Sequence, residues 1–162
     1  MKLDQAIDDL QHAESDLARE LRLLAEHHAT EHDVYHLGHS RADVCREHIM
    51  RLRPFVERYG FHEVEPDDAS TPGLLDAVRR RAAEALGRAE VAGVMLLRDL
   101  RDAYVTAQRV EIEWIIVEQA TKAVRDGELL KVVTSCHEEA EQTAKWLRTR
   151  IKVGAAQVLA TN

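Results

Sequence analysis

Apolar residues recur at steps of three and four over the first 24 residues, and this spacing constrains the fold more than any other feature of the chain. Residues three and four apart share one face of an α-helix. The spacing therefore predicts a long amphipathic helix that ends near His28 and carries one carboxylate, Glu14, on its apolar face. The apolar series consists of Leu3, Ile7, Leu10, Leu17, Leu21 and Leu24.

A second stripe predicts a helix that begins near Asp33 and carries a histidine, His48, on its apolar face. Gly60 is placed to end this helix. Pro54 is expected to bend it, because the proline ring removes a backbone hydrogen-bond donor. The stripe consists of Leu37, Val44, His48, Leu52, Phe55 and Tyr59.

The second half of the chain predicts two further long helices. Gly87 and Gly93 mark an expected break before the first of them, Asp126-Gly127 ends it, and Gly154 closes the other. The expected elements, in chain order, are a loop at residues 61–71, a short helix at 74–86, and long helices at 95–125 and 128–153. We therefore predict one all-α domain, a four-helix bundle over residues 1–154, followed by a tail at 155–162.

The composition agrees with a helical bundle and excludes several classes of function. Charged residues make up 31% of the 162 residues, aromatics only 4%, and seven glycines and three prolines punctuate the chain. The formal charge of −7 argues against nucleic-acid binding, which requires a basic surface. The strongest apolar run, residues 110–117, contains two glutamates, so no membrane span is expected. The N-terminus lacks the apolar core of a signal peptide, which predicts a cytoplasmic protein. Cys45 and Cys136 are expected to be buried thiols in a reducing compartment.

Carboxylates and a histidine on apolar helix faces point to a metal site inside the bundle. A carboxylate di-metal centre takes one glutamate from each of two helices and a Glu-x-x-His pair from each of the other two. Glu14 and Glu111 fit the single positions on the first and third long helices, and Glu111 lies on a stripe with Tyr104, Ala107, Trp114 and Glu118. His48, Glu138 and Glu139 are candidates on the other two helices. Such a set would bind iron or manganese.

The paired motifs are incomplete, and each candidate has a simpler structural interpretation. The chain contains no Glu-x-x-His, and Cys45 stands three residues before His48. Glu14 could lie at the edge of its stripe, His48 could be a hydrogen-bonded core residue, and Glu111 could face solvent. The run 138–141 could be a solvated face. A further histidine cluster, favoured as an adventitious metal binder, comprises His27, His28, His32, His36 and His39.

Three stretches resemble the bacterial stress-associated ferritin-like proteins. They are His12-Ala13-Glu14 with Leu17, Arg51-Leu52 through Tyr59-Gly60, and Ala107 to Glu111 with Glu138-Glu139 and Leu147. The resemblance implies a ferritin-like up-down four-helix bundle with a long crossover that contains the short helix. It also implies metal contacts for Glu14, Glu111 and the Glu138-Glu139 pair. Where the family carries a carboxylate on the second helix, this chain has Val44 or Cys45.

These observations favour a ferritin-like bundle with a degenerate metal site and a non-enzymatic role in stress response or protein interaction, with no resident cofactor. One alternative is a di-iron or di-manganese protein that binds iron or consumes oxygen or peroxide, with Tyr104 or Trp114 as a redox-active neighbour. Another is a small-ligand pocket lined by Trp114, Tyr104 and Met95. The apolar surplus on the third long helix predicts a homodimer; it comprises Val110, Ile112, Ile115, Ile116 and Val117.

Overall fold

The computed structural model describes residues 2–66 and 89–160, and these residues form helices with no strand among them. This confirms the prediction of an all-α chain. The short helix predicted at 74–86 lies outside the described residues. The helices, in chain order, are α1 (Leu3–His27), α2 (His32–Leu52), the 3₁₀ turn η1 (Arg53–Phe55), α3 (Val56–Tyr59), α5 (Ala89–Val124) and α6 (Gly127–Leu159). None of these described helices is both long enough and apolar enough to cross a membrane.

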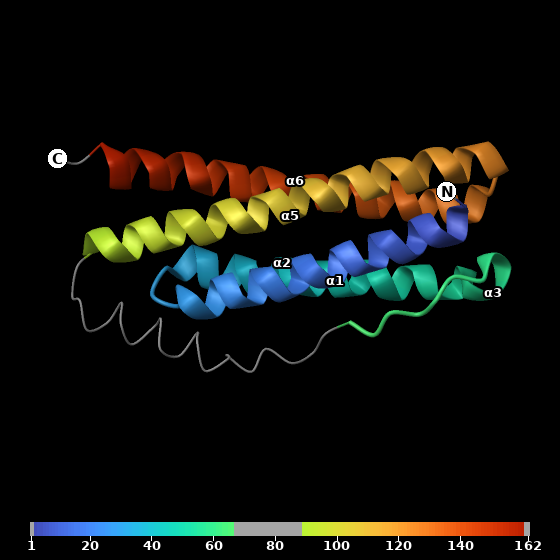
Figure 1. The fold of residues 1–162 in the computed structure, drawn as a ribbon, viewed down its shortest axis with the longest axis horizontal. Coiled ribbons are helices and arrows are strands. Elements are labelled where there is room, and N and C mark those ends of the chain that lie inside the picture. Colours follow the sequence, from blue (N-terminus) through green and yellow to red (C-terminus); the bar gives the residue numbers. More distant parts are fainter. Residues whose placement is uncertain (1, 67–88, 161–162) are drawn as a thin grey trace.

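The four long helices pack side by side as a bundle (Figure 1). Helices α1 and α6 run in one direction, and α2 and α5 run in the other. Helix α3 lies at one end of the bundle, whereas α5 begins at the opposite end (Figure 1). Helix α1 packs against α2 and α5, and α5 also packs against α6, while α2 and α6 touch only sparsely.

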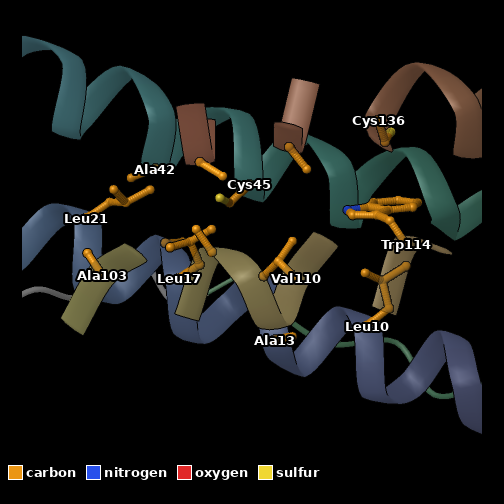
Figure 2. Packing of buried hydrophobic residues seen from close by; sticks show 14 of the residues in the cluster. Leu10, Ala13, Leu17, Leu21, Ala42, Cys45, Ala103, Val110, Trp114 and Cys136 are labelled. Atoms are coloured by element: carbon orange, nitrogen blue, oxygen red, sulfur yellow. The ribbon is translucent and has the colours of Figure 1, made fainter. Parts of the chain in front are cut away.

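Buried residues follow a strict alternation of three- and four-residue steps along α1 and α5. On α1 the series is Ile7, Leu10, Glu14, Leu17, Leu21, Leu24 and His28, and on α5 it is Leu96, Leu100, Ala103, Ala107, Val110, Trp114, Val117 and Thr121. Such a pattern keeps one seam of each helix facing its neighbours along the whole length. Glu14 therefore occupies a regular core position rather than the edge of the stripe. Figure 2 shows the apolar core around this position, with Leu10, Leu17, Cys45, Val110 and Trp114 directed into the space between the helices.

Gly60 and Pro54 act at the turns as expected, whereas Asp126-Gly127 begins α6 and the preceding helix α5 already ends at Val124. Gly60 adopts the left-handed conformation, with φ of 72°, and ends α3. Pro54 falls in the 3₁₀ turn that interrupts the helix after Leu52. The Asp126 carboxylate accepts hydrogen bonds from the backbone N–H groups of Glu128 and Leu129, so this side chain caps α6.

Gly93 and Gly154 do not end helices, which corrects the prediction for both. Helix α5 already begins at Ala89, and α6 continues through Gly154 to Leu159. A Cβ atom at Gly93 would lie 2.7 Å from Cγ2 of Val158, and Gly154 is itself buried, with Leu97 nearby. Gly93 therefore permits α5 and α6 to approach closely, whereas a Cβ at Gly154 would make only an ordinary van der Waals contact of 3.9 Å with Leu97.

Polar contacts join α6 to α2 and α3 at three levels along the side where these helices otherwise touch only sparsely. At one end Arg150 of α6 binds Asp33 at 2.8 Å and Glu31 at 3.0 Å. At the other end the Tyr59 hydroxyl donates to Asp126 at 2.6 Å. In the middle, His48 of α2 lies beside Glu139 of α6, and both residues belong to the candidate site.

Candidate functional site

A buried carboxylate, Glu14 of α1, is the centre of the only polar layer that draws on all four long helices among the described residues. One of its oxygens, Oε1, lies 2.7 Å from Nδ1 of His48 and accepts a hydrogen bond of 2.6 Å from the indole Nε1 of Trp114. The Cys45 thiol lies near enough to this carboxylate for the Glu14 charge to raise the pKa of the thiol. The imidazole of His48 stands edge-on to the Trp114 ring, with 5.6 Å between ring centroids. Two side chains from two other helices, His48 of α2 and Trp114 of α5, thus converge on one carboxylate oxygen.

The layer continues outward from His48 to the protein surface. The second ring nitrogen, Nε2, lies 3.5 Å from Oε2 of Glu139 on α6. The Glu139 side chain is 34% exposed, and its other oxygen accepts a hydrogen bond from Arg51 at 3.1 Å. Negative and positive groups therefore alternate from the core to solvent across the α2–α6 seam. This arrangement leaves no net charge in the layer when His48 is protonated.

The surroundings shift the acidities of the layer in a consistent way. Burial alone would lower the pKa of His48, but the carboxylates of Glu14 and Glu139 outweigh it and hold that pKa above its usual value. Burial, reinforced by the Glu14 charge, raises the pKa of the Cys45 thiol well above its ordinary value. Burial also raises the pKa of the Cys136 thiol to about 12. Both free cysteines are buried, as expected, and both remain protonated thiols at neutral pH.

The layer has the spacing of a carboxylate di-metal site but not its ligands. Cys45 and His48 stand three residues apart on α2, and Cys136 and Glu139 stand three apart on α6. A di-metal site of this kind takes a Glu-x-x-His pair at each of these places and a single glutamate on each of the other helices. Glu14 fills one single position, but Trp114, a donor that cannot bind a metal, faces it from α5.

Three of the five predicted site residues come together in this layer, and two do not. Glu14, His48 and Glu139 are the three that meet. Glu111 lies instead on the outer side of the α5–α6 contact, where Gln108 donates a hydrogen bond to it and burial raises its pKa. It lines a surface cavity of about 270 Å³ with Gln108. Glu138 is solvent-exposed on α6.

The misplacement of Glu111 has a simple geometric cause. Tyr104, Glu111 and Glu118 repeat every seven residues, and so do Ala107, Trp114 and Thr121, so the two lines run in parallel along α5. The sequence treats them as one stripe, but only the second line is fully buried. Trp114 was therefore recognised as a stripe residue, while its role as the donor to Glu14 was missed. Tyr104 lines the same surface cavity as Glu111, whereas Trp114 is buried and does not line that cavity. The cavity therefore does not support the predicted ligand pocket formed by Tyr104 and Trp114 together.

The histidine cluster is divided among several separate contacts. His28 binds Asp99 of α5 at 2.9 Å, and His39 binds Glu26 of α1 at 2.9 Å. His32 and His36 stack on each other at the surface, with ring centroids 5.5 Å apart. Within residues 2–66 and 89–160, no group of three or more histidine, cysteine, aspartate or glutamate side chains is arranged to hold a metal ion.

No protein-family model, no curated protein and no solved structure matches this chain. The functional interpretation therefore rests on the residues of the chain itself.

Proposed function

We propose that this chain is a non-enzymatic helical-bundle protein of ferritin-like ancestry, in which the former metal layer has become a self-neutralising polar core and the outer surface carries the function. The observation that supports this proposal most strongly is the pair of contacts to a single oxygen of Glu14. His48 and the Trp114 indole both bind Oε1, at 2.7 and 2.6 Å. The carboxylate that a metal would need is thus neutralised by the protein's own side chains.

The positions of the layer's residues along the four long helices support the proposed ferritin-like ancestry. Each of the four long helices contributes at one depth, and α2 and α6 contribute at i and i+3, which is the layout of ferritin-like carboxylate sites. The parallel course of α2 and α5 agrees with the long crossover of those folds. The individual residues differ, because cysteine stands at two ligand positions, tryptophan at a third and glutamate at a fourth.

The residues present do not fit a di-metal centre. Such a centre uses four carboxylates and two imidazoles, whereas this layer offers Glu14, Glu139 and His48. The two thiols would have to lose protons that burial holds tightly, as their raised pKa values show. The charge of Glu14 is already balanced by His48. Iron or manganese chemistry is therefore not assigned to the layer.

One observation favours a second candidate, the binding of a single cation at the α2–α6 seam. Within the described residues, Oε2 of Glu14 and Nε2 of His48 make no hydrogen bond. The latter atom points toward the half-exposed Glu139. A cation at this point would have to displace the proton that the raised pKa of His48 retains, so we rank this candidate second.

The test is the metal content of the untagged protein after growth in medium supplemented with iron and manganese. We expect no stoichiometric metal and a melting temperature that neither chelator nor added iron(II) or manganese(II) changes. One equivalent that is lost in His48→Gln, but kept in the exposed control Glu138→Gln, would support the single-cation site. Two equivalents, as in an intact di-metal bundle, would contradict the proposal.

A restored-site variant tests the ancestry separately. It combines Cys45→Glu, Trp114→Glu, Cys136→Glu and Glu139→His, which supplies the four carboxylates and two imidazoles of the ferritin-like layout. We expect this variant to fold only weakly without metal and to gain stability with iron(II) or manganese(II). A variant that folds but ignores both metals would show that the layer does not have ferritin-like geometry.

A further inference from the structure

Two of the nine histidines, His32 and His36 at the start of α2, make no hydrogen bond or ion pair with any residue that the structure describes. Both side chains are exposed, so their ring nitrogens are open to water. Each of the other seven histidines contacts a carboxylate or a backbone carbonyl of the chain; these are His12, His27, His28, His39, His48, His62 and His137. The lack of a polar partner is therefore confined to one pair of neighbouring imidazoles.

These two histidines have the spacing of a chelating pair. Residues four apart lie one above the other on the same face of an α-helix. Two histidines at this spacing are the pair that binds zinc in helical motifs of the form His-Glu-x-x-His. Here the run is His32-Asp33-Val34-Tyr35-His36, and the rings of His32 and His36 stack with their planes 30° apart. The first turn of α2 thus presents two imidazoles side by side.

The distance between the two rings fits a shared metal ion. Zinc lies about 2.0–2.1 Å from an imidazole nitrogen and prefers tetrahedral angles, which places the centroids of two imidazoles on one ion about 5.2 Å apart. The ring centroids of His32 and His36 are 5.5 Å apart. Small rotations of these two exposed side chains therefore bring one nitrogen of each ring onto one ion, with no movement of the backbone.

The charged groups beside the pair favour a cation. Glu31 and Asp33 flank His32 in the chain, and both bind Arg150 of α6, at 3.0 and 2.8 Å. Together the two carboxylates and the guanidinium carry a net charge of −1. The N-terminus of α2 contributes only about half a positive charge. The surroundings of His32 therefore remain negative on balance.

We infer that His32 and His36 chelate one late first-row divalent cation, of the class of zinc(II), nickel(II) and copper(II), with water in the remaining coordination positions. Imidazole nitrogen suits these ions, and the affinity of such a site rises from manganese(II) toward copper(II). Two protein ligands hold a cation less firmly than the four of a structural zinc site, so the ion exchanges with the buffer.

The pair is separate from the core layer, and the inference goes beyond the proposed function. It concerns ions that prefer nitrogen ligands, whereas the test of the core layer concerns iron(II) and manganese(II). Failure of either proposal therefore leaves the other standing.

The first test is calorimetric titration of the untagged, chelator-treated full chain with zinc(II). We expect one equivalent to bind at the pair, and a weaker response to manganese(II). His32→Gln and His36→Gln should each lower the affinity for zinc(II) at least about tenfold, which is the smallest loss typical of the milder changes outside the ligand set. Both residues are exposed, so the helical circular dichroism should not change.

A matched control tests the spacing rather than the number of histidines. The double variant His36→Leu/Leu37→His keeps the composition but moves the second imidazole off the face that carries His32. It should lose zinc(II) binding to the same extent, whereas His62→Gln, which changes an exposed histidine far along the chain, should retain it. A wild-type chain that does not bind zinc(II), or an affinity that survives the double variant, overturns the inference.

Nuclear magnetic resonance of the histidine rings locates the ion. We expect added zinc(II) to shift the ring signals of His32 and His36 together and to leave those of the other seven histidines in place. A shift at His48 alone would place the cation at the contact between α2 and α6 in the core layer. That result would overturn this inference and support the single-cation candidate described above.

Discussion

Removing either half of the buried Glu14–His48 pair should destabilise the bundle, but with opposite dependence on pH. The two changes are His48→Gln and Glu14→Gln, each of which removes one charge and keeps a similar shape. Both side chains are fully buried and their contact is 2.7 Å, so neither remaining group can turn to water. Each must instead lose its charge by gaining or releasing a proton, and the free energy of that step depends on pH.

In His48→Gln, the carboxylate of Glu14 loses its charged partner and keeps the hydrogen bond from the Trp114 indole. Protonating an ordinary glutamate side chain, which titrates near 4.3, requires about 3.7 kcal/mol at pH 7 and about 1 kcal/mol at pH 5. We therefore expect a loss of unfolding free energy of about 4 kcal/mol at pH 7, within the range known for broken buried pairs. The loss should shrink toward about 1 kcal/mol at pH 5.

In Glu14→Gln, the imidazole of His48 keeps only Glu139, 3.5 Å away at the protein surface, as a counter-charge, and it sheds its proton easily above neutral pH. The loss near pH 8 is then that of one charge-assisted hydrogen bond, about 1–2 kcal/mol. At pH 5, keeping an ordinary histidine neutral costs about 2 kcal/mol of additional free energy. The sign agrees with the intact protein, in which the pKa of His48 is raised. The stabilisation by the pair is fully present below the unfolded pKa and is lost as the pH rises through the folded one.

Urea unfolding followed by circular dichroism between pH 5 and pH 8 measures both trends. Glu138→Gln, which changes an exposed glutamate, is the control and should have little effect at any pH. The triple variant Glu14→Leu/His48→Leu/Trp114→Phe should lie close to the wild type, because an apolar pair can replace a buried ion pair without loss and the phenylalanine leaves no indole N–H without an acceptor. Parallel trends in the two half-pair variants, or losses below about 1 kcal/mol in both, would refute the assignment of a buried ion pair.

Three further predictions concern the packing around the layer. Trp114→Phe keeps an aromatic ring but removes the N–H that binds the core carboxylate, so a loss of about 2 kcal/mol in urea unfolding is expected; an unchanged midpoint would contradict that hydrogen bond. Gly38→Ala would place a Cβ 2.9 Å from the side chain and 3.0 Å from the backbone of α1, so a loss of about 1–3 kcal/mol is expected. The control Gly127→Ala meets nothing within 4 Å and should be neutral or slightly stabilising; equal effects would refute the close approach of α1 and α2. Cys45 and Cys136 should react with a thiol reagent only on unfolding, and rapid labelling of the native protein would show that the layer opens to solvent.

Periodicity and turn residues predicted most of the fold. The apolar steps of α1 and the left-handed Gly60 each act locally, so the sequence reveals them directly. Gly93 misled the prediction because its reason is the close approach of a distant helix, and Gly154 because an isolated glycine is tolerated inside a long helix. A glycine that ends a helix and one that admits a neighbour have the same appearance in a sequence.

The candidate site was predictable in part. Glu14 and His48 stood out because each takes a place in an apolar series, and burial of such a group requires a partner. Glu111 lies outside the buried layer because two seven-residue lines lie side by side on α5, and the sequence does not say which of them faces the core. Trp114 was missed because an indole within an apolar stripe is first interpreted as hydrophobic, although its N–H needs an acceptor when buried.

The most direct test of the self-neutralising core is the protonation state of His48, followed by nitrogen-15 NMR of the histidine side chains over a pH titration. The account predicts that His48 keeps both ring protons to a higher pH than an unperturbed histidine, and that added manganese(II) leaves its signals sharp. It also predicts that Glu14→Gln abolishes this difference. A neutral His48 over the whole range, or signals selectively broadened by the metal, would contradict the account.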